Sequence, residues 1–125
     1  METTEKFSVS IVGEKTGNVY AGDFTVKTVL TRRDEFIADS RRRELLGANP
    51  EGALPQLQVE AFMYGQLFVR IVQAPKFWSD AGNGIDLADL NVISKVYETA
   101  KDKEEERIKK VKAQAEEALK QIAKA

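Results

Sequence analysis

The segment PQLQVEAFMYGQLFVRIVQ, residues 55–73, carries the strongest apolar pattern in the chain. Its apolar side chains recur at three- and four-residue spacing, which predicts a helix. These residues are Leu57, Ala61, Met63, Tyr64, Leu67, Phe68, Ile71 and Val72. Further apolar residues at Val59, Phe62 and Val69 widen this stripe, so we expect a helix buried on most sides that ends before Pro75. Gly65 costs about 1 kcal/mol relative to alanine inside a helix, which predicts that another backbone approaches closely there.

Upstream of this helix, two extended runs predict a β-hairpin. Apolar residues alternate with serines over residues 7–12, the period of a strand with one buried face. Residues 13–18 contain two glycines and an asparagine, which is typical of a turn, and a second extended run follows over 19–29. The Gly22-Asp23 pair inside this run predicts a bulge or bend. Because a lone hairpin is marginal in water, it must pack on a helix or pair its edge with another chain.

A second helix is predicted from residue 32 to about Leu46. The Thr31 hydroxyl is placed to accept a hydrogen bond from the first turn, and Asp34 lies near the positive end of the helix dipole. Gly47 is well placed to end the helix, and the loop 47–53 that follows contains a proline and a second glycine. The apolar face of this helix is modest, at Phe36, Ile37, Leu45 and Leu46.

Residues 74–89 predict a loop held to the core by apolar side chains, which are Phe77, Trp78, Ile85 and Leu87. The last helix is expected to begin near Asp86 or Asp89, with these carboxylates in a capping turn, and to continue to the C-terminus. Its first half has a core-facing stripe at Leu90, Ile93, Val96, Tyr97 and Ala100. Such a helix of about 36 residues would be roughly 54 Å long, so we expect its last 20 or so residues to project from the domain.

The segment 101–125, here called the tail, holds eight basic and six acidic residues, a net charge of +2. Its apolar residues form a stripe with alternating three- and four-residue steps, here called the seam, made of Ile108, Val111, Ala115, Ala118 and Ile122. Leu119 lies beside it. Two heptads are fewer than a firm coiled coil shows, so two interpretations stay open. The tail is either a solvated or folded-back amphipathic helix, or it packs on a copy of itself or on a partner.

The predicted fold class is therefore α+β: an N-terminal β-hairpin packed on a small helical core, with a long C-terminal helix that extends as a short coiled-coil-like tail. The predicted division is a globular domain over 1–100 and a charged amphipathic helical tail over 101–125. At 125 residues, the chain has the length of one domain.

Composition excludes several classes of chemistry. The chain has no cysteine and no histidine, which excludes disulfides, cysteine nucleophiles and triads that contain histidine, and leaves a zinc site without its usual ligands. Its 19 basic and 20 acidic residues give a net charge of −1, so no overall field attracts nucleic acid or an anionic membrane. No apolar run approaches the roughly 20 residues of a membrane span, and the polar, acidic N-terminus does not resemble a secretory signal. We expect a soluble, intracellular protein without enzymatic activity.

No motif supplies a catalytic, cofactor-binding or metal-binding residue. The glycines of residues 13–17 lack the order and the following helix of a phosphate-binding loop, and residues 79–90 lack the ligand pattern of an EF-hand. Arginines 32, 33 and 41–43 form a candidate nucleic-acid patch, but acidic residues interleave with them and consecutive helical residues point about 100° apart. We expect surface ion pairs there. No carboxylate lies in a sequence that would bury it, so we name no acid–base pair.

Five short stretches carry a family resemblance: GDFTVKTVL (22–30), DSRRRELLG (39–47), VRIVQAPKFW (69–78), GIDL (84–87) and DLNVI (89–93). Together they resemble small tailed-bacteriophage proteins of the virion morphogenesis cluster, of the tail-assembly-chaperone kind, over roughly residues 22–100. The resemblance implies a non-enzymatic protein that holds an aggregation-prone partner until tail proteins polymerise around it. It places the protein in the host cytoplasm during assembly. The ordered hairpin and long helix depart from a chaperone with a disordered tail, which keeps open a component retained in the virion.

The expected function is protein–protein association in phage particle assembly, without a cofactor. The partners implied are other phage structural proteins and a second copy of the chain. The hairpin edge would dock by strand addition, Phe77 and Trp78 would anchor a partner, and the seam would mediate self-association or docking. A pair such as Phe77 and Trp78 is more often buried in the core, which is the other interpretation of these residues. A generic coiled-coil adaptor and a nucleic-acid-binding module that uses the arginines remain the competing functions.

Overall fold

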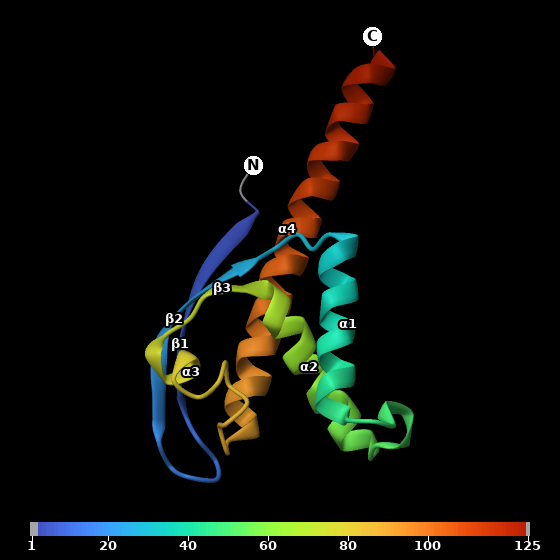
Figure 1. Ribbon diagram of the computed structural model, residues 1–125. Coiled ribbons are helices and arrows are strands. Elements are labelled where there is room, and N and C mark those ends of the chain that lie inside the picture. The colour runs from blue at the N-terminus through green and yellow to red at the C-terminus, as the bar shows by residue number, and fades with distance from the viewer. Residues whose placement is uncertain (1–2, 125) are drawn as a thin grey trace.

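The computed structural model describes residues 3–124 and shows an α+β fold, as predicted. A three-stranded antiparallel sheet in the order β1-β2-β3 is formed by β1 (Thr4–Val12), β2 (Val19–Lys27) and β3 (Ile71–Gln73). The helices are α1 (Arg32–Leu46), α2 (Pro55–Arg70), the short α3 (Lys76–Ser79) and α4 (Leu90–Lys124), with a 3₁₀ turn at Pro50–Gly52. Figure 1 shows α4 crossing the sheet and extending beyond the rest of the molecule.

The predicted hairpin is present, but the bulge predicted at Gly22-Asp23 is wrong. The β1–β2 register is continuous from Thr4↔Lys27 to Val12↔Val19. Gly22 is required by packing instead, since a Cβ there would lie 2.3 Å from the Cβ of Pro75. The second strand also ends at Lys27, two residues earlier than predicted.

The helix predicted over 55–73 ends earlier, at Arg70, and the prediction of a helix through Gln73 is wrong. Ile71–Gln73 form β3 and pair with β2, with Ile71 opposite Val26. Two physical causes favour this outcome. Ile71 and Val72 are β-branched, and Pro75 shifts the chain before it toward extended conformations. Ile71–Gln73 therefore extend the sheet instead of the helix.

Local signals for α1 are confirmed. The Thr31 hydroxyl accepts a hydrogen bond from the Asp34 backbone N–H at 3.1 Å, and the Thr31 N–H donates to the Asp34 carboxylate at 3.0 Å. Gly47 ends the helix with a φ of 82°, and its N–H donates to the Arg43 carbonyl at 3.2 Å. The close approach predicted at Gly65 is also present, because a Cβ there would lie 2.4 Å from the Ala38 carbonyl oxygen of α1.

The core lies where the sheet, α2, α4 and the 74–89 loop meet. Its buried members are Phe7, Val9, Phe24, Val26, Leu67, Trp78, Ile93, Val96 and Ala100. Trp78 from α3 packs edge-on against Phe24 of β2, with ring centroids 5.5 Å apart. The stripe predicted for the first half of α4 is the side that enters this core.

α4 is one continuous helix of 35 residues, including the polar stretch 101–107. At 1.5 Å per residue it is about 52 Å long. Its buried residues end at Ala100, and every residue over 111–124 is exposed, so the predicted projection of the tail is confirmed. None of the described helices is long and apolar enough to cross a membrane.

Candidate protein-interaction surface

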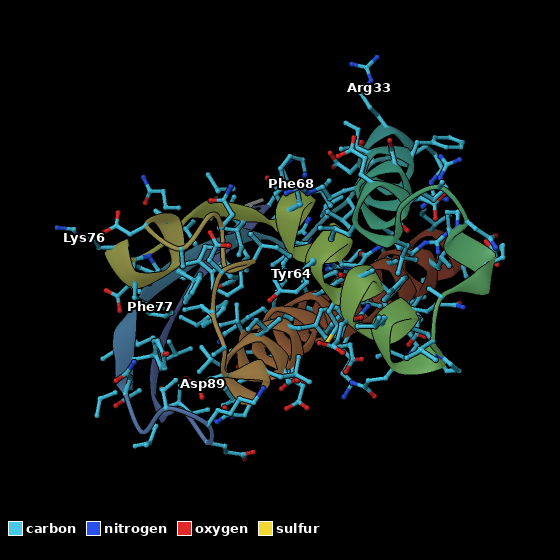
Figure 2. All side chains as sticks on the ribbon, turned by 60° about the horizontal axis from the view of Figure 1, so that its bottom comes forward. Arg33, Tyr64, Phe68, Lys76, Phe77 and Asp89 are labelled. Atoms are coloured by element: carbon cyan, nitrogen blue, oxygen red, sulfur yellow. The ribbon has the colours of Figure 1, made fainter. Side chains whose placement is uncertain are left out.

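The beginning of α4 is fixed to the hairpin turn by Asp89. This residue is 1% exposed, and its carboxylate accepts hydrogen bonds from the backbone N–H groups of Lys15 (2.7 Å) and Thr16 (3.0 Å). The Thr16 hydroxyl (2.6 Å) and the Tyr20 hydroxyl (2.7 Å) donate to the other oxygen. These hydrogen bonds, with that of the Thr16 hydroxyl foremost, lower the pKa of Asp89 to about 2. Figure 2 shows Asp89 at the junction of the hairpin and α4.

This geometry corrects two expectations. All four hydrogen bonds described for the Asp89 carboxylate come from residues 15–20, so its role is to hold the hairpin turn rather than to cap α4. The expectation that no carboxylate is buried is also wrong. Sequence reasoning missed both because the partners lie 69 to 74 residues away in the chain. Asn91 adds to the same junction, since its amide donates to the Val12 carbonyl at 3.0 Å and accepts from the Glu14 N–H at 3.1 Å.

A second anchor holds α4 where the tail begins. Arg70, at the end of α2, forms an ion pair with Glu104, and the two side chains are 4% and 20% exposed. The Arg70 guanidinium also donates to Gln66 at 3.0 Å, and Lys101 lies 3.8 Å from the Glu104 carboxylate. The Asp89 and Glu104 contacts, fifteen residues apart, fix the direction in which the tail leaves the domain.

Beyond this anchor, the seam is exposed. Ile108 is 55% exposed and Ile122 is 71% exposed. Val111, Ala115 and Ala118 are exposed as well, so within the described residues the seam is not folded back on its own domain. The folded-back form of the first interpretation is therefore wrong, and both the solvated helix and the helix that packs on a copy or a partner stay open.

The seam forms one wall of a groove of about 660 Å³ that the sequence did not predict. The opposite wall is residues 28–30, which leave the sheet after Lys27 and run beside α4 toward α1 (Figure 1). The lining is Thr28, Val29 and Leu30 on one side and Glu104, Arg107, Ile108, Val111, Lys112 and Ala115 on the other. The Thr28 hydroxyl is buried there without a hydrogen-bond partner among the described residues. Three of the five seam residues thus share this groove.

Phe77 and Trp78 of the 74–89 loop were predicted to anchor a partner, and for Trp78 this prediction is wrong. It is 2% exposed and packs in the core, which was the alternative for this pair. Phe77 is half-buried and contacts the rings of Tyr20 and Phe24, with centroids 5.3 and 6.0 Å away. In Figure 2, Phe77 lies against the strands while Lys76 beside it projects away from the body. This loop therefore completes the core.

The outer edge of β1 is the second candidate surface. Within the described residues β1 pairs with β2 alone. The Thr28 N–H donates to the Thr3 carbonyl and the Gly13 N–H donates to the Asn18 carbonyl. These bonds and the register place the odd-numbered residues of β1 in hydrogen-bonded pairs with β2. The backbone groups of Lys6, Ser8 and Ser10 consequently face outward along the edge. Strand addition at this edge stays a prediction.

Arginines 32, 41, 42 and 43 of α1 form surface ion pairs, as expected. Arg42 and Arg43 lie 2.9 and 3.1 Å from the Asp39 carboxylate, and Arg41 lies 3.3 Å from Glu44. Arg41 also packs over the Phe68 ring at 5.2 Å. Arg33 projects away from the body in Figure 2. This arrangement gives no support to a phosphate-binding patch.

Comparisons with family models, with curated proteins and with solved structures find no match for this chain. Among residues 3–124, no group of three or more carboxylates that could hold a metal ion is found. The arrangement described above can do one thing directly: it presents an apolar seam and a groove at a fixed place beside the core.

Proposed function

We propose that the protein works by non-enzymatic protein–protein association in bacteriophage particle assembly, in the manner of a tail assembly chaperone. The phage setting rests on the resemblance over residues 22–100. The association rests on one observation, the 660 Å³ apolar groove that continues into the exposed seam. A component retained in the virion is the second form of this proposal.

Energetics support an interaction role for this surface. Burying one isoleucine or valine side chain contributes about 1.5–3 kcal/mol relative to leaving it exposed. Ile108, Val111 and Ile122 are exposed on the projecting part of α4, and their spacing keeps them on one face. An apolar face on a projecting helix is typical of a binding surface.

The first experiment compares purified virions of the source phage with infected-cell lysate by mass spectrometry. A protein present in lysate and absent from virions is expected for an assembly factor, and many copies in each particle would indicate the retained component. Absence of the gene from any phage or prophage would overturn the phage setting and leave a generic adaptor.

The second experiment tests the surface. The phage gene carrying Ile108→Glu and Ile122→Glu should give fewer infectious particles than the gene carrying Ala113→Glu, which places the same charge off the seam. Equal particle yields from both genes would contradict the proposed role of the seam.

A further inference from the structure

Asn83 is followed by Gly84, and this is the only Asn-Gly pair in the chain. The other asparagines precede residues that hinder attack on their side chains: Asn18 and Asn91 precede valine, and Asn49 precedes proline. Valine is crowded by its β-branched side chain, and proline has no backbone N–H. Glycine has no Cβ, so its backbone nitrogen can approach the preceding side chain most closely. The sequence therefore singles out Asn83 as the asparagine most prone to deamidation.

The structure leaves the Asn83 side chain free to react. This side chain is exposed, and within residues 3–124 its amide has no hydrogen bond or other polar contact. Its backbone has a φ of 58°, between Gly82 at 59° and Gly84 at 87°. Asparagine adopts this left-handed conformation more readily than most residues. The three residues thus form a left-handed turn in the 74–89 loop, with the Asn83 amide open to water.

Gly84, in contrast, is buried and held on both sides of its peptide unit. Its N–H donates to the Trp78 carbonyl at 3.1 Å, and its own carbonyl accepts from the Tyr64 hydroxyl at 3.0 Å. A Cβ at this position would lie 2.6 Å from the Trp78 ring, so only glycine fits there. The nitrogen that would attack Asn83 is therefore engaged in the closed loop, and it becomes available when the loop opens.

We propose that Asn83 is a self-modification site, at which the chain deamidates spontaneously at a rate set by the opening of the Gly84 hydrogen bond. The Gly84 nitrogen loses its proton and bonds to the side-chain carbonyl carbon of Asn83. The amide nitrogen takes up a proton and leaves as ammonia, and the product is a cyclic imide. Water then cleaves the new carbon–nitrogen bond, which gives aspartate, or the original peptide bond, which gives isoaspartate. This inference goes beyond the proposed function and does not rest on it.

Isoaspartate at position 83 would change the contacts of Gly84. Its backbone runs through the Cβ of the former asparagine, so the chain becomes one atom longer between Gly82 and Gly84. The Trp78 ring leaves no room over Gly84, and the Tyr64 hydrogen bond fixes the carbonyl, so the longer loop has to move off the ring. Trp78 is 2% exposed and is the only tryptophan in the chain, so its fluorescence reports on this loop without interference.

The first test incubates the purified full chain at mildly acidic and at alkaline pH, in water enriched in heavy oxygen, and follows each asparagine by peptide mass spectrometry. The heavy oxygen marks the reaction that takes place before digestion, since water supplies the new carboxylate oxygen. Conversion should appear at Asn83 and be faster at alkaline pH, because the attacking nitrogen has to lose its proton. Asn18 and Asn91 are internal controls and should stay unchanged. An unconverted Asn83, or equal conversion at the three positions, would overturn the site.

The second test concerns the restraint on Gly84. The same chain unfolded in urea should convert Asn83 faster than the folded chain by about three- to tenfold, which is the factor that one ordinary hydrogen bond contributes. Equal rates in the folded and the unfolded chain would overturn the control by the Gly84 hydrogen bond.

The third test measures what the modification does to the loop. Trp78 emission of the aged parent protein should move to longer wavelength and become easier to quench with acrylamide. Asn83→Gly is the matched control, because it removes the amide and keeps the left-handed backbone without strain. Its mass and its emission should not change over the same period. Full conversion to isoaspartate with unchanged emission, or an equal change in Asn83→Gly, would overturn the displacement of the loop from Trp78.

Discussion

Removing the Glu104 carboxylate should strongly destabilise the protein because it leaves the Arg70 guanidinium buried without its ion partner. Breaking a buried ion pair costs about 3–5 kcal/mol. Gln66 retains its hydrogen bonds to Arg70, and the Glu104 side chain is 20% exposed, so water can reach part of the site. We therefore expect Glu104→Ala to lower the free energy of unfolding by about 2–3 kcal/mol.

This loss is measurable by heat or urea. An unfolding entropy of about 2.1 cal/mol/K per residue gives roughly 0.26 kcal/mol/K for 125 residues, so 1 kcal/mol corresponds to about 4 °C. Glu104→Ala should lower Tm by about 8–12 °C in a circular dichroism melt. Glu105→Ala is the matched control, because that neighbouring side chain is exposed, and it should change stability by less than about 0.5 kcal/mol.

The double variant Arg70→Met with Glu104→Leu removes both charges. It therefore separates the destabilisation caused by an unpaired buried charge from the net contribution of the ion pair to stability. Apolar residues of similar volume can replace a buried pair with little loss, so its Tm should return to within about 4 °C of the parent protein. A Tm for Glu104→Ala within 2 °C of the parent protein would refute the reasoning, because it would mean that Arg70 finds full solvation without Glu104.

Three further outcomes are expected. Gly65→Ala should lower the free energy of unfolding, measured with urea, by about 1–3 kcal/mol, because the new Cβ would lie 2.4 Å from the Ala38 carbonyl oxygen. Alanine favours helices, so increased stability would contradict the close contact. The pKa of Asp89 is about 2, against an ordinary 3.8, so the stability that its carboxylate contributes is complete above about pH 4 and is lost as pH falls toward 2. Asp89→Asn should flatten this acid part of the plot of unfolding free energy against pH, measured by urea unfolding. An unchanged plot would exclude the carboxylate as the source of the pH dependence. Ile108→Glu with Ile122→Glu should lower the oligomeric mass without lowering Tm, and an unchanged light-scattering mass would exclude the seam.

Elements defined by neighbouring residues could be predicted from the sequence. The hairpin, the Thr31–Asp34 cap, the end of α1 at Gly47 and the close approach at Gly65 all follow from local chemistry or from one helical period. The α+β class and the projecting tail follow from the same patterns. At Ile71–Gln73, where the apolar spacing predicts a helix, pairing with the edge of β2 decides the outcome, and no local pattern reveals that edge.

The candidate surface could be predicted only in part. The seam is visible in the sequence because its residues lie on one helix, whereas the other wall of the groove comes from Val29 and Leu30, about 80 residues earlier. Trp78 left two interpretations open because a large aromatic side chain suits both a core and an interface, and its packing on Phe24 decides for the core. Sequence patterns do not show which distant residues come together in space, because that depends on how the whole core packs.

The contacts that hold the core-facing part of α4 also fix the position of the seam that follows it. Asp89 and Asn91 hold its beginning to the hairpin turn, and Glu104 holds it to α2 just before the seam emerges. A helix held at both places presents Ile108 and Val111 beside residues 28–30 before any partner arrives. Little backbone order then has to be gained on binding, which is the main means by which a small interface reaches useful affinity. The Asp89 and Asn91 contacts, at the other end of the anchored part of α4, should therefore influence association by fixing the direction of the tail.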